Sequence, residues 1–312
     1  MKIAFLTEGG FEGKVPRDHP NSRVDVAWQI ALDAYHLPMF APWQTKEKFD
    51  LAIWIIPKKN IDHVMNQDYM GRLRNVATNV ATMQEGPSWF FQDYPLDQQV
   101  WYYNTLCEAD TIFAHNYNDL NYFKGLTNHK NVKLLPSVMV EDTIIKSILV
   151  KPEDRKNVII GGNMCRWYGG FDSLITAQEL ELPIYAPAMG RKVAGEEQIV
   201  NILPYMQWNE WIQQLSQFRY AVHLMPTQAA GTFAMNCAYL GIPCVGYKGL
   251  DTQETLFPYL TVDIGDVKSA KHFLKKLQDD KEFYNLNVEV AQKYYQEFYT
   301  EEAFKEQFYE QF

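Results

Sequence analysis

Long apolar segments are missing from this 312-residue sequence. Its longest apolar run, Leu51 to Ile56, has the length of a strand, whereas a helix that crosses a bilayer needs about 18 apolar residues. The first stretch, Met1 to Leu6, holds one lysine and is too short for the hydrophobic core of a signal peptide. We therefore expect a cytoplasmic protein with no transmembrane segment.

Patterns that bind metals or form disulfides are also missing. The four cysteines show no CxxC spacing, and the seven histidines form neither HxH nor HExxH. The sequence has no Asp-x-Asp triplet that could hold a divalent cation, and no G-x-x-x-x-G-K-[ST] loop of the P-loop nucleotidases. It thus predicts reduced core cysteines, no metal and no bound cofactor.

Positive charge is in deficit. The chain has 29 basic and 38 acidic residues, a formal net charge of −9, which argues against a broad nucleic-acid-binding surface but leaves room for a local basic site. Hydrophobic residues make up 47% of the chain, enough for packed cores throughout. The length suits two α/β domains of about 150 residues each.

Short apolar runs alternate with amphipathic stretches, which is typical of βα units and parallel sheets. The first unit is a strand at Lys2 to Leu6, a glycine-rich turn at Thr7 to Gly13, and a helix from Ser22 to Tyr35. A further helix is predicted at Asp97 to Cys107. The other strands predicted in this half lie at 50–56, 76–83, 110–114 and 132–135. These elements predict an N-terminal Rossmann-like domain over residues 1–145.

The same alternation resumes after the polar connector 151–156. The strands predicted in this half lie at 158–161, 182–186, 199–203, 220–225, 243–247 and 259–262, and the helices at 172–179, 208–217, 234–240 and 267–278. They predict a second Rossmann-like domain over 146–290. Residues 291–312 read as terminal helices that pack on the lobes, with a return to the N-terminal domain as one arrangement. The expected fold class is α/β, with two parallel sheets that face an interdomain cleft.

The loop Pro226 to Thr232 joins a predicted strand to a predicted helix. A glycine loop that enters a helix presents unpaired backbone N–H groups, so Gly231 and Thr232 could bind a diphosphate, or they could simply cap the helix. The run Met225-Pro226-Thr227, Gly231 and Asn236 to Val245 resembles the motif of GT-B glycosyltransferases, in particular the retaining group called family four. By this resemblance Gln228 and Asn236 stand where that family has two glutamates, and Asn236 would contact the nucleotide ribose.

A second match to the same family opens the C-terminal half, at Ile159 to Asp172. Arg166 takes the place of the family's diphosphate-binding arginine, and Gly169 or Gly170 stands where its lysine is expected. The planar guanidinium suits two phosphate oxygens. The resemblance also suggests phosphate or base contacts by Lys192, beside Arg191, and a nucleobase pocket walled by Tyr205 and Met206; a solvated basic pair and core packing are the respective alternatives.

The N-terminal domain should bind the acceptor. Glu8, with Gly9 and Gly10, follows the first strand, where open α/β sheets place ligands. Two segments, Gln84 to Phe90 and Arg23 to Trp28, resemble glycosyltransferases of phage and environmental origin. Glu85, His115 and Glu8 are candidate catalytic groups for the acceptor proton, although an exposed acid or a histidine at a strand end has ordinary structural explanations as well.

The resemblance implies a metal-independent glycosyltransferase, of the hexosyltransferase type, that moves a sugar from a UDP- or GDP-sugar to a hydroxyl acceptor. The acceptor could be a glycan, a small molecule or modified DNA. Three alternatives stay open at this point: a phage enzyme that glycosylates hydroxymethylpyrimidines in DNA, a nucleotide-sugar epimerase of the same fold, and a non-catalytic two-lobed binding protein.

Overall fold

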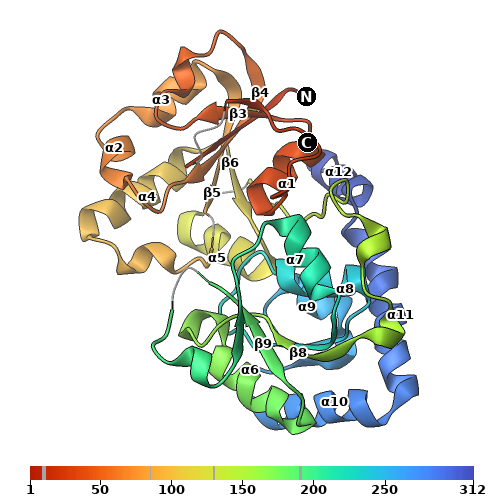
Figure 1. Ribbon diagram of the computed structural model, residues 1–312. Helices are drawn as coiled ribbons and strands as arrows, with labels where there is room; N and C mark the ends of the chain where they lie inside the picture. The colour runs from red at the N-terminus through yellow and green to blue at the C-terminus, as the bar shows by residue number, and fades with distance from the viewer. Residues whose placement is uncertain (9–11, 85, 129–130, 190–191) are drawn as a thin grey trace. The chain divides into compact units, whose positions relative to one another are not determined.

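The computed structural model describes residues 1–8, 12–84, 86–128, 131–189 and 192–312 (Figure 1). The chain forms two compact units. Unit 1 comprises Met1–His19, Arg23–Val140 and Phe304–Phe312, and unit 2 comprises Pro20–Ser22 and Glu141–Ala303. Apart from the short segment Pro20–Ser22, the chain changes unit after Val140 and after Ala303, whereas the sequence predicts limits at 145 and 290. The acceptor and donor roles of the two domains stay predictions.

Unit 1 is built on a seven-stranded sheet in the order β2-β3-β1-β4-β5-β6-β7. Only β2 runs antiparallel to its neighbour among these strands. The strands are β1 Ile3–Thr7, β2 Gly13–Lys14, β3 Tyr35–Pro38, β4 Phe49–Ile56, β5 Ala77–Gln84, β6 Thr111–Ala114 and β7 Val132–Leu134.

Helices cover both faces of this sheet. Side chains alternate along a strand, so Phe5 of β1 packs on one face with Trp28 of α1, while Leu6 packs on the other with Leu73 of α3. The C-terminal helix α12 joins the first face through Phe304 and Phe308, and Figure 1 shows it beside α1. The helices are α1 Val24–Ala31, α2 Ile61–Met65, α3 Tyr69–Arg74, α4 Leu96–Glu108, α5 Tyr117–Thr127 and α12 Glu301–Tyr309.

Unit 2 is built on a six-stranded parallel sheet in the order β10-β9-β8-β11-β12-β13. Helix α6 packs against β8, β11 and α10, and α8 packs against β11, β12, α9 and α11. The strands are β8 Lys156–Ile160, β9 Ile184–Pro187, β10 Asn201–Leu203, β11 Phe218–His223, β12 Cys244–Tyr247 and β13 Thr261–Val262. The helices are α6 Gly170–Ala177, α7 Trp208–Leu215, α8 Thr232–Leu240, α9 Asp251–Leu256, α10 Val267–Asp279 and α11 Lys281–Phe298.

One sequence prediction about this architecture was wrong. The helix expected from Ser22 to Tyr35 is shorter, because α1 ends at Ala31 and Tyr35 already begins β3. Asp33 reverses the chain between them with a φ of +50°, in the left-handed region that aspartate tolerates better than most residues. The buried run at Ile30 to Leu32 and Ala34 satisfies a helical and an extended pattern equally, so periodicity could not separate the two elements.

Among the described residues, no helix combines the length and the apolar character that a bilayer crossing requires.

Candidate functional site

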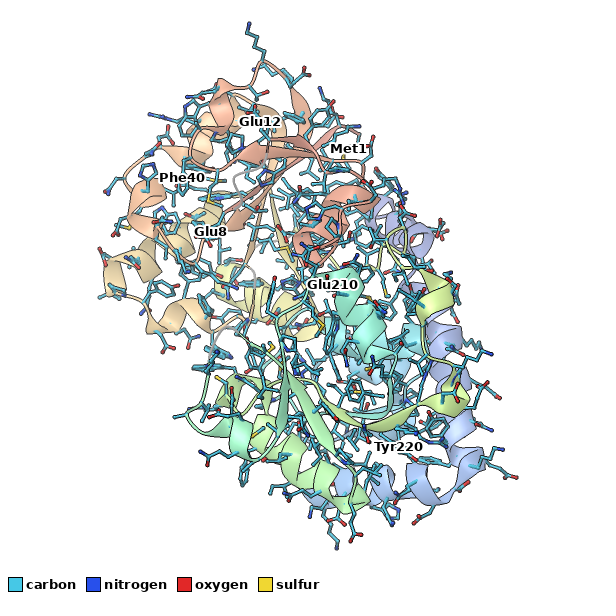
Figure 2. The ribbon with its side chains drawn as sticks, in the orientation of Figure 1. Met1, Glu8, Glu12, Phe40, Glu210 and Tyr220 are labelled. Carbon is cyan, nitrogen blue, oxygen red and sulfur yellow. The ribbon has the colours of Figure 1, made fainter. Side chains whose placement is uncertain are left out.

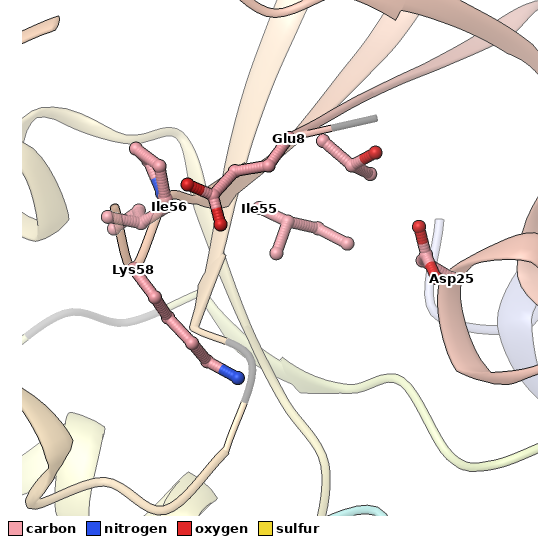
Figure 3. A pocket seen from close by; sticks show the side chains of 7 residues that line it. Glu8, Asp25, Ile55, Ile56 and Lys58 are labelled. Carbon is pink, nitrogen blue, oxygen red and sulfur yellow. The ribbon is translucent and has the colours of Figure 1, made fainter. Parts of the chain in front are cut away.

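The first candidate site lies at the carboxyl edge of the unit 1 sheet. A cavity of about 140 Å³ opens where β1 and β4 end, and Figure 3 shows Glu8 and Lys58 on one side of it and Asp25 of α1 on the other. Strand β1 lies between β3 and β4 in the sheet, so the strands that follow it in the chain are added on opposite sides of it. Open α/β sheets bind ligands at the carboxyl edge of such a point. The lining residues are Thr7, Glu8, Asp25, Ile55, Ile56, Pro57 and Lys58.

Hydrogen bonds fix the two turns that carry the charged groups. Glu8 Oε1 accepts from the backbone N–H of Lys59 at 2.9 Å, which ties the carboxylate to the turn after β4. The Tyr94 hydroxyl donates to the carbonyl of Lys58 at 2.8 Å, and the Lys58 ammonium lies 5.4 Å from the centre of the Phe90 ring. The cavity therefore combines fixed carboxylate and ammonium groups, which suits a polar, hydroxyl-bearing ligand.

His115 follows β6 at the same edge. Its imidazole is 5% exposed and stacks on Trp28 at 5.4 Å, and neither ring nitrogen has a hydrogen-bond partner among the residues that the structure describes. Burial, assisted by the nearby positive charge of Lys58, lowers the pKa of His115 to about 4. The ring is thus neutral at pH 7, with one nitrogen able to accept a proton or a hydrogen bond.

A buried polar group beside His115 has the opposite shift. Asn116 caps α5 by accepting from the backbone N–H of Asp119 at 2.8 Å, and Asp119 is 2% exposed. Burial raises the pKa of Asp119 to about 6, although hydrogen bonds from Ser88 and Asn116 lower it in part. The carboxylate holds the start of α5 against the loop after β5.

The sequence did not single out Lys58 or Asp25 as site residues. The signal was available, because Lys58 follows the strand that pairs with β1, and that pairing defines the ligand-binding edge. Of the predicted acceptor and catalytic residues, Glu8 and His115 lie at this edge. Glu85, Gly9 and Gly10 lie outside the described residues, so their roles stay predictions.

The second candidate site lies at the carboxyl edge of the unit 2 sheet, where the two family-like segments meet. Strands β8 and β11 are parallel neighbours, so the loops that leave them adjoin. The Arg166 side chain is exposed in a short 3₁₀ turn after β8, with its guanidinium carbon 5.9 Å from the centre of the Trp167 ring. It forms no ion pair with another residue in the described part of the chain, which leaves its charge available to a ligand.

A buried carboxylate braces the loop that carries Arg166. Glu196 is 5% exposed; its Oε2 accepts from the backbone N–H of Met164 and its Oε1 from the Asn163 amide, both at 3.2 Å. Asn163 is itself fully buried. Charge-assisted hydrogen bonds of this kind fix a loop more firmly than neutral ones, so the position of Arg166 is preset by the fold.

Gly169 is one of the two glycines predicted to stand where the resembling family has a lysine. Its φ is +63°, and a Cβ atom there would lie 1.7 Å from the Leu224 carbonyl oxygen, so no side chain fits. This close approach packs the start of α6 on the segment after β11. The two predicted diphosphate segments are thereby brought together within unit 2.

We expect Gly169→Ala to lower the free energy of unfolding of unit 2 by at least about 3 kcal/mol, because the methyl group adds a backbone clash to an unfavourable φ. Chemical denaturation of both proteins measures the difference. Gly125→Ala, on α5, is the control: a Cβ there meets nothing within 4 Å, and alanine favours a helix. Equal stability of Gly169→Ala and wild type would contradict the clash.

The start of α8 is arranged as the sequence predicted. Gly231 precedes the helix with a φ of +69°, and its carbonyl accepts from Thr252 Oγ1 at 2.9 Å. Thr232 is the first helical residue. The first turns of α8 and α6 lie at one edge of the sheet, and the N–H groups of a helix start favour an anion; binding of a diphosphate to Gly231 and Thr232 stays a prediction.

Four predicted nucleotide contacts lie around the same edge. Tyr205 is 70% exposed and lies with Met206 between β10 and α7. The first turn of α7 includes Glu210, labelled in Figure 2, whose carboxylate accepts from the Gln207 backbone N–H at 3.1 Å. The Gln228 side chain lies over Gly249. Lys192 is exposed after β9. Their ligand contacts stay predictions.

Asn236 faces inward. It is 3% exposed, and in the orientation that satisfies both polar atoms its oxygen accepts from Trp211 Nε1 and its nitrogen donates to the carbonyl of Thr232, each at 3.3 Å. The amide thus joins α8 to α7. Its predicted ribose contact would have to replace or share these bonds.

His115, His223 and Asp119 give the two units different pH responses. Burial lowers the pKa of His223, at the end of β11, to about 4, as it does for His115. Below the ordinary value of 6.5 the unfolded chain therefore binds more protons at both sites. In unit 1 Asp119 offsets this, since its raised pKa makes the folded state bind the extra proton below pH about 6.

We expect unit 2 to lose about 1.4 kcal/mol of unfolding free energy per pH unit as pH falls from about 6.5 to 4, while unit 1 changes little between pH 6 and 4. Denaturant titrations at pH 7, 6 and 5, with a probe in each unit, measure the two slopes. His223→Leu should flatten the unit 2 slope. An unchanged slope in that variant would assign the effect to other groups.

The sequence matches no family model. It also matches none of the curated proteins. The structure, in contrast, is similar to solved structures over nearly the whole chain. Anabaena HepE, in complex with UDP and glucose, aligns with a TM-score of 0.69 at 12% identity, over 99% of this chain and 98% of that chain.

Two other solved structures align over the same length. An α-glucosyltransferase in complex with UDP and a 13-mer DNA containing an HMU base aligns with a TM-score of 0.66 at 16% identity, over 99% of this chain and 98% of that chain. Sucrose-phosphate synthase from Thermosynechococcus elongatus aligns at 0.63 and 10%, over 100% and 99%. The two parallel-sheet units match GT-B structures, so the predicted α/β class with two Rossmann-like domains is confirmed.

Proposed function

We propose that the protein is a UDP-sugar-dependent glycosyltransferase, of the hexosyltransferase type, that acts on a hydroxyl acceptor. The observation that carries this proposal is the match of the whole chain to GT-B structures, among them HepE and the α-glucosyltransferase, each solved with UDP. An exposed arginine on a braced loop at the carboxyl edge of the unit 2 sheet adds the group that a diphosphate needs.

In this proposal unit 2 holds the donor. When the bond from the sugar to the diphosphate breaks, negative charge develops on the leaving phosphate, and Arg166 and the N–H groups at the starts of α6 and α8 stabilise it. A side chain is excluded at both Gly169 and Gly170, where the resemblance places a lysine, so Arg166 and the helix starts carry more of that task, with Lys192 as a further cation. No step in this scheme requires a metal or a bound cofactor.

Unit 1 holds the acceptor and the group that receives its proton. The cavity of Glu8, Asp25 and Lys58 presents carboxylates and an ammonium that suit a hydroxyl-bearing molecule. His115, neutral at pH 7, accepts a hydrogen bond from the reacting sugar or acceptor at this edge. Glu8 and Glu85 remain candidates for proton transfer.

The test is a panel of UDP-, GDP- and other nucleotide sugars, with release of the nucleoside diphosphate as the readout. We expect UDP release from one UDP-sugar, accelerated by an acceptor. Binding of a UDP-sugar without turnover would favour a two-lobed binding protein, and recovery of an isomerised UDP-sugar would favour an epimerase. A folded protein that neither binds nor turns over any nucleotide sugar would overturn the proposal.

DNA is a second acceptor class, favoured by the α-glucosyltransferase solved with HMU-containing DNA. The net charge of −9 weighs against it, because phosphate contacts supply most of the affinity for DNA. A gel shift at low salt with hydroxymethylated and plain duplexes decides: retention of modified DNA, with transfer of sugar to it, supports a DNA acceptor. Absence of any shift excludes that class.

A further inference from the structure

One buried carboxylate in unit 2 joins two loops that leave the sheet at the same edge. Glu196 begins the short turn Glu196–Gln198, in the segment between β9 and β10. Its side chain reaches the loop after β8, where Oε1 accepts from the Asn163 amide and Oε2 from the Met164 backbone N–H, both at 3.2 Å. Strands β8 and β9 are parallel neighbours, so both segments lie at the carboxyl edge of the sheet.

Asn163 passes this contact on to Arg166. Its side-chain nitrogen donates to the carboxylate, and its side-chain oxygen accepts from the Cys165 N–H at 3.3 Å, directly before the turn that Arg166 begins. A Cβ atom at Gly170 would lie 1.9 Å from the Asn163 carbonyl oxygen, so the start of α6 packs on the same residue. A displacement of Asn163 would therefore move both Arg166 and the first turn of α6.

The other end of this link carries Lys192. The Glu196 N–H donates to the Val193 carbonyl at 3.2 Å, and Gly195, with a φ of +81°, lies within the turn that this bond closes. Lys192 comes directly before the turn and is exposed. The carboxylate thus joins two segments, each of which carries a cation predicted to contact phosphate.

This contact requires a carboxylate rather than an amide. Two N–H groups point at the two oxygens of Glu196, whereas a glutamine would turn its own NH2 group against one of these donors. Because Glu196 is 5% exposed and Asn163 is fully buried, a donor that lost its acceptor here would stay unsatisfied. The substitution Glu196→Gln is therefore nearly isosteric but loosens the link.

We propose that Glu196 is a positioning residue for the diphosphate of the sugar donor. It holds Arg166 and Lys192 at the spacing at which both cations reach one diphosphate, and it acts through them without touching the ligand. Cations that are held in place before binding lose less freedom when the ligand arrives, so the diphosphate binds more tightly. The inference rests on the proposed function, because it requires that unit 2 binds a nucleoside diphosphate.

Calorimetric titration of Glu196→Gln with UDP and with uridine tests this role. We expect the Kd for UDP to rise about tenfold, and the affinity for uridine, which lacks the phosphates, to change by less than about twofold. The kcat for transfer should fall by a similar factor of about ten, because the same cations stabilise the leaving diphosphate. Glu197→Gln is the matched control: Glu197 is the next residue of the same turn and is exposed, so this variant should bind both probes as wild type does.

A combined variant shows whether the effect passes through the two cations. In a protein that carries Arg166→Ala and Lys192→Ala, adding Glu196→Gln should weaken UDP binding by less than about twofold, because the groups that it positions are gone. Hydrogen exchange at the Met164 amide should be faster in Glu196→Gln, which reports the broken contact without any ligand. Glu196→Asp, whose shorter side chain keeps both oxygens, should show the same selective loss for UDP and serves as a second variant if the glutamine variant does not fold.

The outcomes separate this role from the proposed function. Equal losses for UDP and uridine, or a full tenfold loss in the protein without the two cations, would leave Glu196 a residue of the fold alone. Unchanged UDP affinity in Glu196→Gln, with wild type binding UDP, would overturn the positioning role and leave the proposed function intact. A wild type that binds no nucleoside diphosphate would overturn both.

Discussion

Arg166→Ala should lower kcat/KM for the sugar donor about 100-fold and leave the free energy of unfolding within about 0.5 kcal/mol of wild type. The stability is preserved because the side chain is exposed and pairs with no acid in the described part of the chain. The activity falls because the arginine stabilises charge that develops as the diphosphate leaves, so we expect kcat to fall together with kcat/KM.

Arg166→Lys separates charge from geometry. Lysine keeps the positive charge but loses the planar fork that holds two phosphate oxygens, so we expect a loss of about tenfold rather than 100-fold. Lys268→Ala is the matched control, since Lys268 is an exposed cation on α10 of the same unit. Initial rates of UDP release and calorimetric titration with UDP measure both effects.

A result within threefold of wild type for Arg166→Ala would remove this arginine from the diphosphate site. The remaining cation predicted near that site, Lys192, would then be the next to test. If wild type itself releases no UDP from any donor, titration with UDP still reports whether Arg166 contributes to binding, so the two questions stay distinguishable.

Most of the fold could be predicted from the sequence because its strands are buried on both faces. The run Asp50 to Ile56 is continuously apolar after its first residue, and the structure has β4 at Phe49–Ile56. The sequence did not predict β2 or β3. Strand β2 has only two residues, too few to show a pattern, and β3 follows the apolar end of α1 almost directly. Edge elements of this length depend on their neighbours rather than on their own sequence.

The unit 2 segments could be predicted because a loop motif is contiguous in the chain. Arg166, Gly169 and Gly231 carry local signals, and the structure brings their loops together beside Leu224. The unit 1 site could be predicted only in part, because Lys58, Asp25 and His115 come from three separate segments that meet through strand order. The sequence also did not predict the hydrogen bond between Asn236 and Trp211, since no local pattern indicates a partner 25 residues away in the chain.

His115→Leu should lower kcat for sugar transfer about 100-fold or more. The same variant should be as stable as wild type or more stable. The imidazole is almost fully buried and unpartnered among the described residues, so it costs desolvation without a compensating hydrogen bond. Leucine of similar volume removes that cost. A buried side chain that destabilises the fold, at the edge of a sheet where ligands bind, is expected where function requires that side chain.

Thr82→Val is the matched control for His115→Leu. Thr82 is also fully buried in unit 1, on β5, and its hydroxyl has no partner in the described ranges, so valine removes the same kind of defect at a similar volume. We expect that variant to gain stability and keep its activity. UDP affinity should be unchanged in both variants, because the proposed nucleotide contacts belong to unit 2.

The pH profile then separates a chemical from a structural role. A neutral imidazole with a pKa of about 4 keeps its accepting nitrogen down to that pH, so the acid limb of kcat in wild type should lie near pH 4 rather than near 6.5. His115→Gln, which retains an acceptor oxygen but cannot take a proton, should recover part of the activity lost in His115→Leu and show no such limb. Equal activity of His115→Leu and wild type would leave the ring a packing partner of Trp28 with no part in the reaction, and proton transfer would rest with Glu8 or Glu85 alone.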